Sequence, residues 1–124
     1  MTLPRLTIDL DAVAGATRRL AADLRGRGMT LAGVTKCVEG EPEVGRTLLE
    51  AGCAGLADSR LPALVRLAGQ ALGPLTLIRA PERHELETAA QVADRVLLME
   101  RGQVTLNSSR DDFEKALADP RPRG

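Results

Sequence analysis

The stretch TLAGVTKCVEGEPEVGRTLLEAGCAGLADSR, residues 30–60, contains a complete strand–helix–strand pattern. Its two ends, 30–36 and 54–59, are apolar runs of strand length. Between them, 41–52 has the signals of a helix, with Pro42 in its first turn and a glycine at its C-terminal end. A strand, a helix and a second strand in this order predict two parallel strands joined by a right-handed crossover.

The alternation of strand and helix patterns continues on both sides of this unit. Before it, 5–10 predicts a short strand, and 11–28 predicts a helix that begins at a capping Asp11. The apolar face of this helix is predicted to contain Val13, Ala16, Leu20 and Leu24. After the unit come predicted helices at 60–72, 81–93 and 110–119, predicted strands at 75–80 and 94–99, and a turn with another short strand within 100–109. Ser108 or Ser109 is expected to cap the last helix.

The predicted fold class is α/β with parallel strands. The ends of three predicted strands, at Lys36, Ser59 and Arg79, recur every 20 to 23 residues. This spacing suits a partial (βα)₈ (TIM-type) barrel of four to five βα units, and it also suits a flavodoxin-like doubly wound sheet. One domain is expected over 1–119, with a disordered tail at 120–124. In both folds, ligands bind at the C-terminal ends of the strands.

Composition narrows the classes of function. The formal net charge is zero, acidic and basic residues are interspersed, and Phe113 is the single aromatic residue, which argues against nucleic acid as a partner. Cys37 and Cys53 form no CxxC pair or zinc-ligand cluster, so reduced thiols and no metal are expected. No apolar run has the length of a signal sequence or a membrane span. A cytoplasmic protein with no membrane partner is therefore predicted.

Lys36 is the residue with the most specific chemistry. The chain has two lysines, Lys36 and Lys115, against fifteen arginines, and Lys36 stands at the predicted end of an apolar strand. An amine whose stem is covered by apolar neighbours is more readily neutral, and a neutral amine attacks carbonyl groups to form a Schiff base. The alternative is an ordinary surface lysine that extends its ammonium into solvent at a strand end.

Four segments carry a resemblance to a known family: IDLDAV at 8–13, GVTK at 33–36, GLADSR at 55–60 and LIRAP at 77–81. Over about residues 4–95 the sequence resembles the opening of the pyridoxal-phosphate-dependent alanine racemase-type family, in particular its ornithine and amino-acid racemase branch. The resemblance implies a truncated N-terminal part of a (βα)₈ barrel and an amino-acid substrate. It also implies that Lys36 forms the Schiff base with pyridoxal 5′-phosphate.

Polar residues near the strand ends look like the polar strand termini of that family. They are the candidates to hold the cofactor beside Lys36: Ser59, Arg60, Arg79, Asn107 and Ser108. Each has an alternative role, because Asp58 and Ser59 could cap the following helix and the others could be surface or turn residues. Residues 92–104 also resemble a strand–turn–strand of ATP-binding-cassette ATPases, but the chain has no GxxxxGK[ST] phosphate loop.

The second acid that racemisation requires is not evident in this chain. In alanine racemases the resemblance implies a tyrosine from the partner subunit, and this sequence contains no tyrosine. Cys37 and His84 are the other titratable candidates; Cys37 is expected to point away from Lys36 on an alternating strand, and His84 to be a surface residue. Three hypotheses stay open: a racemase segment that requires a homodimer partner or a missing C-terminal segment, a non-catalytic protein that binds pyridoxal phosphate, and an inactive fragment with a structural or interaction role.

Overall fold

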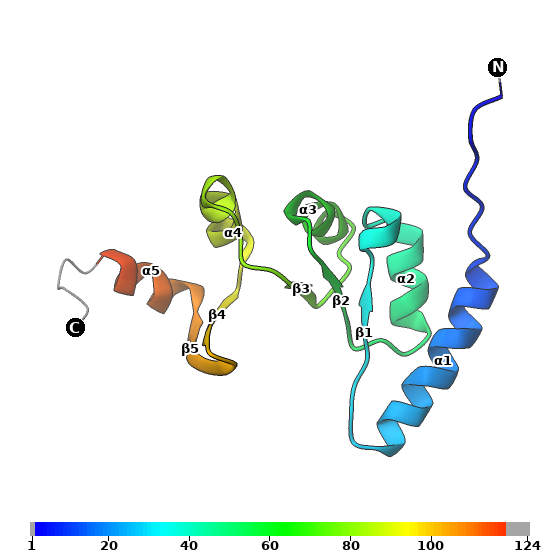
Figure 1. Cartoon of the computed structure of the whole chain (residues 1–124), viewed down its shortest axis with the longest axis horizontal. Coiled ribbons are helices and arrows are strands. Elements are labelled where there is room, and N and C mark those ends of the chain that lie inside the picture. The colour runs from blue at the N-terminus through cyan, green and yellow to red at the C-terminus, as the bar shows by residue number, and fades with distance from the viewer. Residues whose placement is uncertain (1, 119–124) are drawn as a thin grey trace. The chain divides into compact units, whose positions relative to one another are not determined.

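The computed structural model describes residues 2–118, and the predicted tail at 120–124 lies outside them. The chain divides into two compact units, Met1–Pro81 and Glu82–Gly124, which are described separately. The first unit contains α1 (Leu10–Gly26), β1 (Ala32–Val34), the 3₁₀ turn η1 (Lys36–Val38), α2 (Pro42–Glu50), β2 (Gly55–Asp58), α3 (Leu61–Gly69) and β3 (Leu75–Leu77). The second contains the 3₁₀ turn η2 (Arg83–Glu85), α4 (Leu86–Val92), β4 (Arg95–Glu100), β5 (Gln103–Ser109) and α5 (Arg110–Ala118). Figure 1 labels the helices and strands along the chain.

The first unit is built on a parallel sheet with the strand order β1-β2-β3. Val34 of β1 is in register with Ala57 of β2, and Ala57 is in register with Thr76 of β3. Because each strand is followed by a helix or turn and then by the next parallel strand, the C-terminal ends of all three lie at one edge of the sheet. The predicted strand–helix–strand unit and the α/β class are therefore confirmed.

A small aliphatic core lies between the sheet and α2 and α3. Leu56 of β2 packs with Leu64 and Leu67 of α3, and all three are buried. Helix α2 approaches the sheet closely at Gly45, where an added Cβ would stand 3.0 Å from Leu56. In Figure 1, α2 lies beside β1 and α1 lies outside α2. The core rests on leucines, since the chain has no tryptophan or tyrosine to fill it.

The start of the chain corrects two predictions. Residues 5–10 form no strand; Leu6 is 77% exposed, and helix α1 already begins at Leu10. The N-cap is Asp9 rather than Asp11, because the Asp9 carboxylate accepts a hydrogen bond from the Ala12 N–H at 3.0 Å. The apolar alternation of this segment has no neighbouring strand to pair with, so the local helix cap decides its structure.

The predicted apolar face of α1 is also partly wrong. The buried side chains are Ala14, Thr17 and Ala21, at helical spacing, whereas Leu20 is 49% exposed. Ala21 lies against Gly52, where an added Cβ would come within 3.1 Å. Small residues therefore line the contact between α1 and the end of α2, and the larger Leu20 lies outside it.

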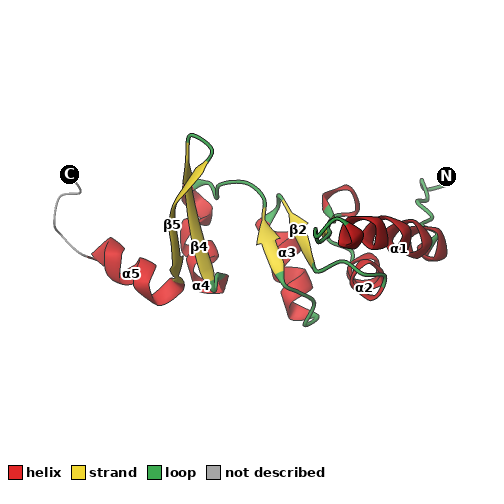
Figure 2. Ribbon diagram, turned by 90° about the horizontal axis from the view of Figure 1, so that it is seen from below, coloured by secondary structure: helices red, strands yellow, loops and turns green. Residues whose placement is uncertain are grey.

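The second unit departs from the predicted parallel sheet. Strand β4 pairs antiparallel with β5, and Figure 2 shows the two strands side by side. The connection is the two-residue turn Arg101-Gly102, in which both residues have positive φ, 49° and 77°. This is the geometry of a tight β-hairpin. The predicted strand at 94–99 and the predicted turn and strand within 100–109 are confirmed, but the pairing that the structure shows for them is antiparallel. The Ser109 hydroxyl accepts from the Asp112 N–H at 3.3 Å, which confirms Ser109 as one of the two predicted caps of α5.

The helix predictions at 41–52, 60–72 and 110–119 are confirmed by α2, α3 and α5; α2 and α3 are three to four residues shorter than expected, and α5 extends to Ala118, the last residue that the structure describes. Between residues 2 and 118, none of the helices combines the length and the apolar character needed to cross a membrane.

Candidate functional site at the ends of the parallel strands

The ends of β1 and β2 are joined by two buried polar side chains, Thr35 and Asp58, which are both 0% exposed. The Thr35 hydroxyl donates to Asp58 Oδ2 at 2.7 Å, and the Arg60 N–H donates to Asp58 Oδ1 at 2.8 Å. The Asp58 carboxylate thus binds both Thr35, which precedes Lys36, and Arg60, which precedes helix α3. Thr35 was not among the predicted site residues, although a hydroxyl at the end of an otherwise apolar strand is a signal for it.

Lys36 follows Thr35 and begins the 3₁₀ turn η1. Its side chain is exposed, and among the described residues it forms no hydrogen bond or ion pair. The expectation that apolar neighbours cover its stem is therefore wrong for this chain. The position at the C-terminal end of a parallel strand is as predicted, and the amine is accessible to a ligand.

Glu39 and Gly40 return the chain from η1 to α2 in left-handed conformations, with φ of 54° and 68°. The Glu39 carboxylate lies 3.1 Å from the Arg60 guanidinium, and the Glu39 carbonyl accepts a hydrogen bond from Arg66 of α3. A shallow hollow of about 400 Å³ opens here, lined by Glu39, Arg60, Pro62, Ala63 and Arg66. The segment after Lys36 is thereby attached to α3, and two guanidinium groups border the hollow.

The other predicted residues divide between the two units. Ser59, half-buried, and Arg60 follow β2 directly, so they share the sheet edge with Lys36. Arg79 follows β3 in the same unit, and its guanidinium donates to the Ala80 carbonyl at 2.9 Å. The structure therefore places residues from three successive strand ends at one edge.

Asn107 and Ser108 lie in β5, in the second unit. The Asn107 side-chain oxygen accepts a hydrogen bond from Arg95 of β4. The Ser108 hydroxyl oxygen is buried and has no hydrogen-bond partner among the described residues. Their role in a shared site with Lys36 stays a prediction.

The predicted acid–base candidates are both exposed. Cys37 lies within η1, so the argument from strand alternation that turned it away from Lys36 does not apply. His84 lies in η2 with Nδ1 3.4 Å from the Glu82 carboxylate. Across residues 2–118, His, Cys, Asp and Glu side chains form no group of three that could hold a metal ion.

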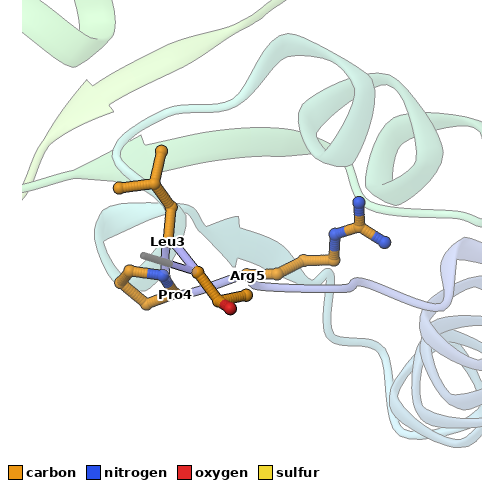
Figure 3. A pocket seen from close by; sticks show the side chains of 4 residues that line it. Leu3, Pro4 and Arg5 are labelled. Atoms are coloured by element: carbon orange, nitrogen blue, oxygen red, sulfur yellow. The ribbon is translucent and has the colours of Figure 1, made fainter.

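A second hollow, of about 750 Å³, borders the N-terminal segment and is lined by the consecutive residues Thr2, Leu3, Pro4 and Arg5. Figure 3 shows the labelled side chains pointing away from one another. Leu3 is 79% exposed. Because no groups from different elements converge here, this hollow has less chemical specificity than the strand ends.

The donor groups beside Lys36 are compatible in part with pyridoxal phosphate. A primary amine can bond the cofactor's carbonyl carbon, and the guanidinium groups of Arg60 and Arg66 have the charge that an anion requires. The guanidinium groups already contact Glu39, through its carboxylate and its carbonyl. The described residues therefore account for covalent attachment better than for a closed phosphate cradle.

Comparison with known proteins supports a relationship to racemases. The chain is similar to a lysine racemase of Thermotoga maritima, with 31% identity over 99 residues. The matched part covers 79% of this chain and 28% of that protein, so the chain spans less than a third of its relative's length. No protein-family model matches the sequence.

Proposed function

We propose that this chain is an N-terminal barrel segment of a pyridoxal-phosphate-dependent amino-acid racemase of the alanine racemase type. The observation that carries the proposal is the accessible amine of Lys36, which lies two residues after the end of β1 at the edge where three parallel strands end. The similarity to a lysine racemase supports the class of reaction. Three parallel strands with helices against one face are also how a (βα)₈ barrel begins, and we propose that the domain extends over 1–119.

In this proposal Lys36 holds pyridoxal 5′-phosphate through a covalent bond to its amine. When bound, the cofactor supplies an electron sink that stabilises negative charge at the substrate's α-carbon. The Lys36 amine would be the group that removes or returns the proton at that carbon on one face. Ser59 and Arg60 lie at the same edge and are proposed to hold the phosphate; Arg79, Asn107 and Ser108 are the further candidates.

The acid for the opposite face, and the remaining strands of a barrel, are proposed to come from a further segment or from a second copy of the chain. Because the similar protein is named a lysine racemase, L-lysine is the first substrate to test, followed by L-ornithine and L-alanine. A protein that holds pyridoxal phosphate without racemising an amino acid is a second candidate function. It is favoured by the lack of tyrosine in the sequence.

The test begins with cofactor attachment. The purified chain is mixed with pyridoxal phosphate, reduced with borohydride and digested, and the modified lysine is located by mass spectrometry. We expect the adduct at Lys36, its loss in Lys36→Ala, and its retention in the matched control Lys115→Ala. Modification of Lys36 no greater than that of Lys115, which is an exposed lysine on α5, would remove the basis of both cofactor hypotheses.

If the adduct forms, the second step measures exchange of the substrate's α-proton in deuterated water. Exchange that is lost in Lys36→Ala supports the racemase. The exchange is measured for the chain alone and for the chain mixed with a C-terminal segment of its relative. If pyridoxal phosphate attaches to Lys36 but the α-proton does not exchange in either case, the result supports a protein that only holds the cofactor.

A further inference from the structure

The backbone immediately before Lys36 is held by every polar group of Thr35. The Thr35 N–H donates to the Ala57 carbonyl at 3.0 Å, and its carbonyl accepts from the N–H groups of Val38 and Gly40, both at 3.1 Å. Its hydroxyl donates to Asp58 at 2.7 Å. The first contact extends the parallel ladder by one residue past β1, and the next two close the turn that contains Lys36. Thr35 therefore fixes the position from which the Lys36 side chain starts.

The burial of the Asp58 carboxylate between the two strand ends has a desolvation cost. A carboxylate with no exposed surface loses its hydration, and hydrogen bonds from Thr35 and Arg60 offset that cost without turning it into a large gain. Two well-packed apolar side chains would join β1 and β2 with less loss of hydration. The advantage of the polar contacts is that they are directional. The hydrogen bonds from Thr35 and Arg60 to Asp58, at 2.7 and 2.8 Å, fix one relative position of the two strand ends, whereas apolar contacts allow several.

Arg60 connects this pair to the far end of the Lys36 turn. Its N–H is held by Asp58, and its guanidinium lies 3.1 Å from the Glu39 carboxylate. Arg66 also donates to the Glu39 carbonyl. The turn from Lys36 to Glu39 is therefore anchored to β2 at its beginning and to α3 at its end, while the Lys36 side chain remains exposed.

We propose that Thr35 and Asp58 are positioning residues for the Lys36 amine. They hold the backbone under Lys36 so that the amine is presented from a rigid base at the sheet edge. This inference rests on the proposed function of Lys36, and it assigns the two buried residues no contact with cofactor or substrate. A reacting group that is positioned before reaction gains rate, and a displacement of about 1 Å can cost as much as about 100-fold.

The experiment uses Lys115 as an internal reference. The full chain is exposed briefly to pyridoxal phosphate and reduced with borohydride, and the ratio of Lys36 to Lys115 modification is measured by mass spectrometry. Lys115 lies in α5 of the second unit and serves as the reference for an exposed lysine. We expect Thr35→Val to lower the ratio by about tenfold. Thr35→Ser keeps the hydroxyl. Asp58→Asn keeps both contacts, because its amide oxygen can accept from the Arg60 N–H and its amide NH2 can donate to the Thr35 hydroxyl. Both variants should therefore stay within about twofold of the original ratio.

Thr17→Val is the matched control. Thr17 is also a buried threonine, and its hydroxyl donates to the Val13 carbonyl within α1 at 2.7 Å, away from the strand ends. The control removes a buried hydroxyl by the same substitution and should leave the Lys36 to Lys115 ratio unchanged. An equal loss in Thr17→Val would mean that the ratio reports general destabilisation, and the positioning role would be rejected.

The outcomes separate the two proposals. Modification of Lys36 at the level of Lys115 in the unmodified sequence contradicts the proposed function itself. Preferential modification of Lys36 that Thr35→Val leaves unchanged contradicts only the positioning role. If Thr35→Val does not fold, hydrogen exchange of the original chain provides the test: the Val38 and Gly40 amides, which donate to Thr35, should be protected, and exchange at the rate of an open loop would overturn the inference.

Discussion

Gly40 lies so close to Ala63 of helix α3 that a Cβ added to Gly40 would stand 2.8 Å from the Ala63 Cβ. The same glycine has a φ of +68°, a conformation that side chains disfavour. We therefore expect Gly40→Ala to lower the free energy of unfolding by about 1 kcal/mol for the left-handed backbone and by about 1–3 kcal/mol more for the contact. Urea unfolding followed by circular dichroism measures it, since the chain has no tryptophan or tyrosine to report by fluorescence.

Gly28 supplies the control for this substitution. Its φ is +73°, and an added Cβ would meet nothing within 4 Å. Gly28→Ala should therefore show the backbone cost of about 1 kcal/mol alone. Equal losses for the two variants would show that the end of the Lys36 turn is not packed tightly against α3.

The core between the sheet and α3 depends on Leu67, which has no exposed surface. Truncation of a fully buried leucine removes apolar contacts and leaves a cavity, so Leu67→Ala should cost about 2–5 kcal/mol. In a leucine-based core without large aromatic rings, no neighbour is well suited to fill that space. The free energy of unfolding, again from urea titration, is the measurement.

Val65 on the same helix is 43% exposed and provides the comparison. Val65→Ala should change stability by about 0.5 kcal/mol, in the range typical of surface substitutions. A Leu67→Ala variant as stable as Val65→Ala would mean that the sheet and α3 are not packed together in solution.

The parts of the fold that could be predicted from the sequence are those decided by local interactions. Helices α2, α3 and α5 begin and end near residues that favour helix caps or turns, and these residues can be recognised from a few adjacent positions in the sequence. Strands depend on a partner elsewhere in the chain. Residues 5–10 have the alternation of a strand but no partner, and β4 pairs with β5 because Arg101-Gly102 forms a tight turn. A glycine in a two-residue connection between apolar runs was the available signal for that hairpin.

In the candidate site, too, the features decided by neighbouring residues could be predicted, and those that depend on distant residues could not. The position of Lys36 at a strand end followed from the apolar run before it and the resemblance of GVTK to a family motif. The Thr35–Asp58 hydrogen bond did not, because it joins residues 23 positions apart. Its formation depends on the register in which Val34 pairs with Ala57. Register is a property of the assembled sheet, so no local pattern around Thr35 or Asp58 could specify it.

Cys53 gives a prediction for the dependence of stability on pH. The side chain is 7% exposed, and burial raises the pKa of its thiol above the ordinary value of 9.0. Above that pH the unfolded chain releases the thiol proton while the folded chain retains it, so the folded state binds more protons. The contribution of this group to stability should therefore be complete below pH 9.0 and should decrease as the pH rises through the raised pKa. Urea unfolding across this range measures the effect.

The comparison with Cys53→Ala isolates the thiol from the other groups that titrate at high pH. The difference in unfolding free energy between the original chain and this variant should be constant below pH 9.0 and should decrease above it. Cys37→Ala is the matched control, because Cys37 is exposed in η1, and this variant should follow the pH dependence of the original chain. A difference between the original chain and Cys53→Ala that stays constant through the alkaline range would mean that the Cys53 thiol is hydrated in the folded state. It would also mean that the contact of the α2–β2 connection with β1, where Cys53 Sγ would lie 3.3 Å from a Cβ on Gly33, is open to water.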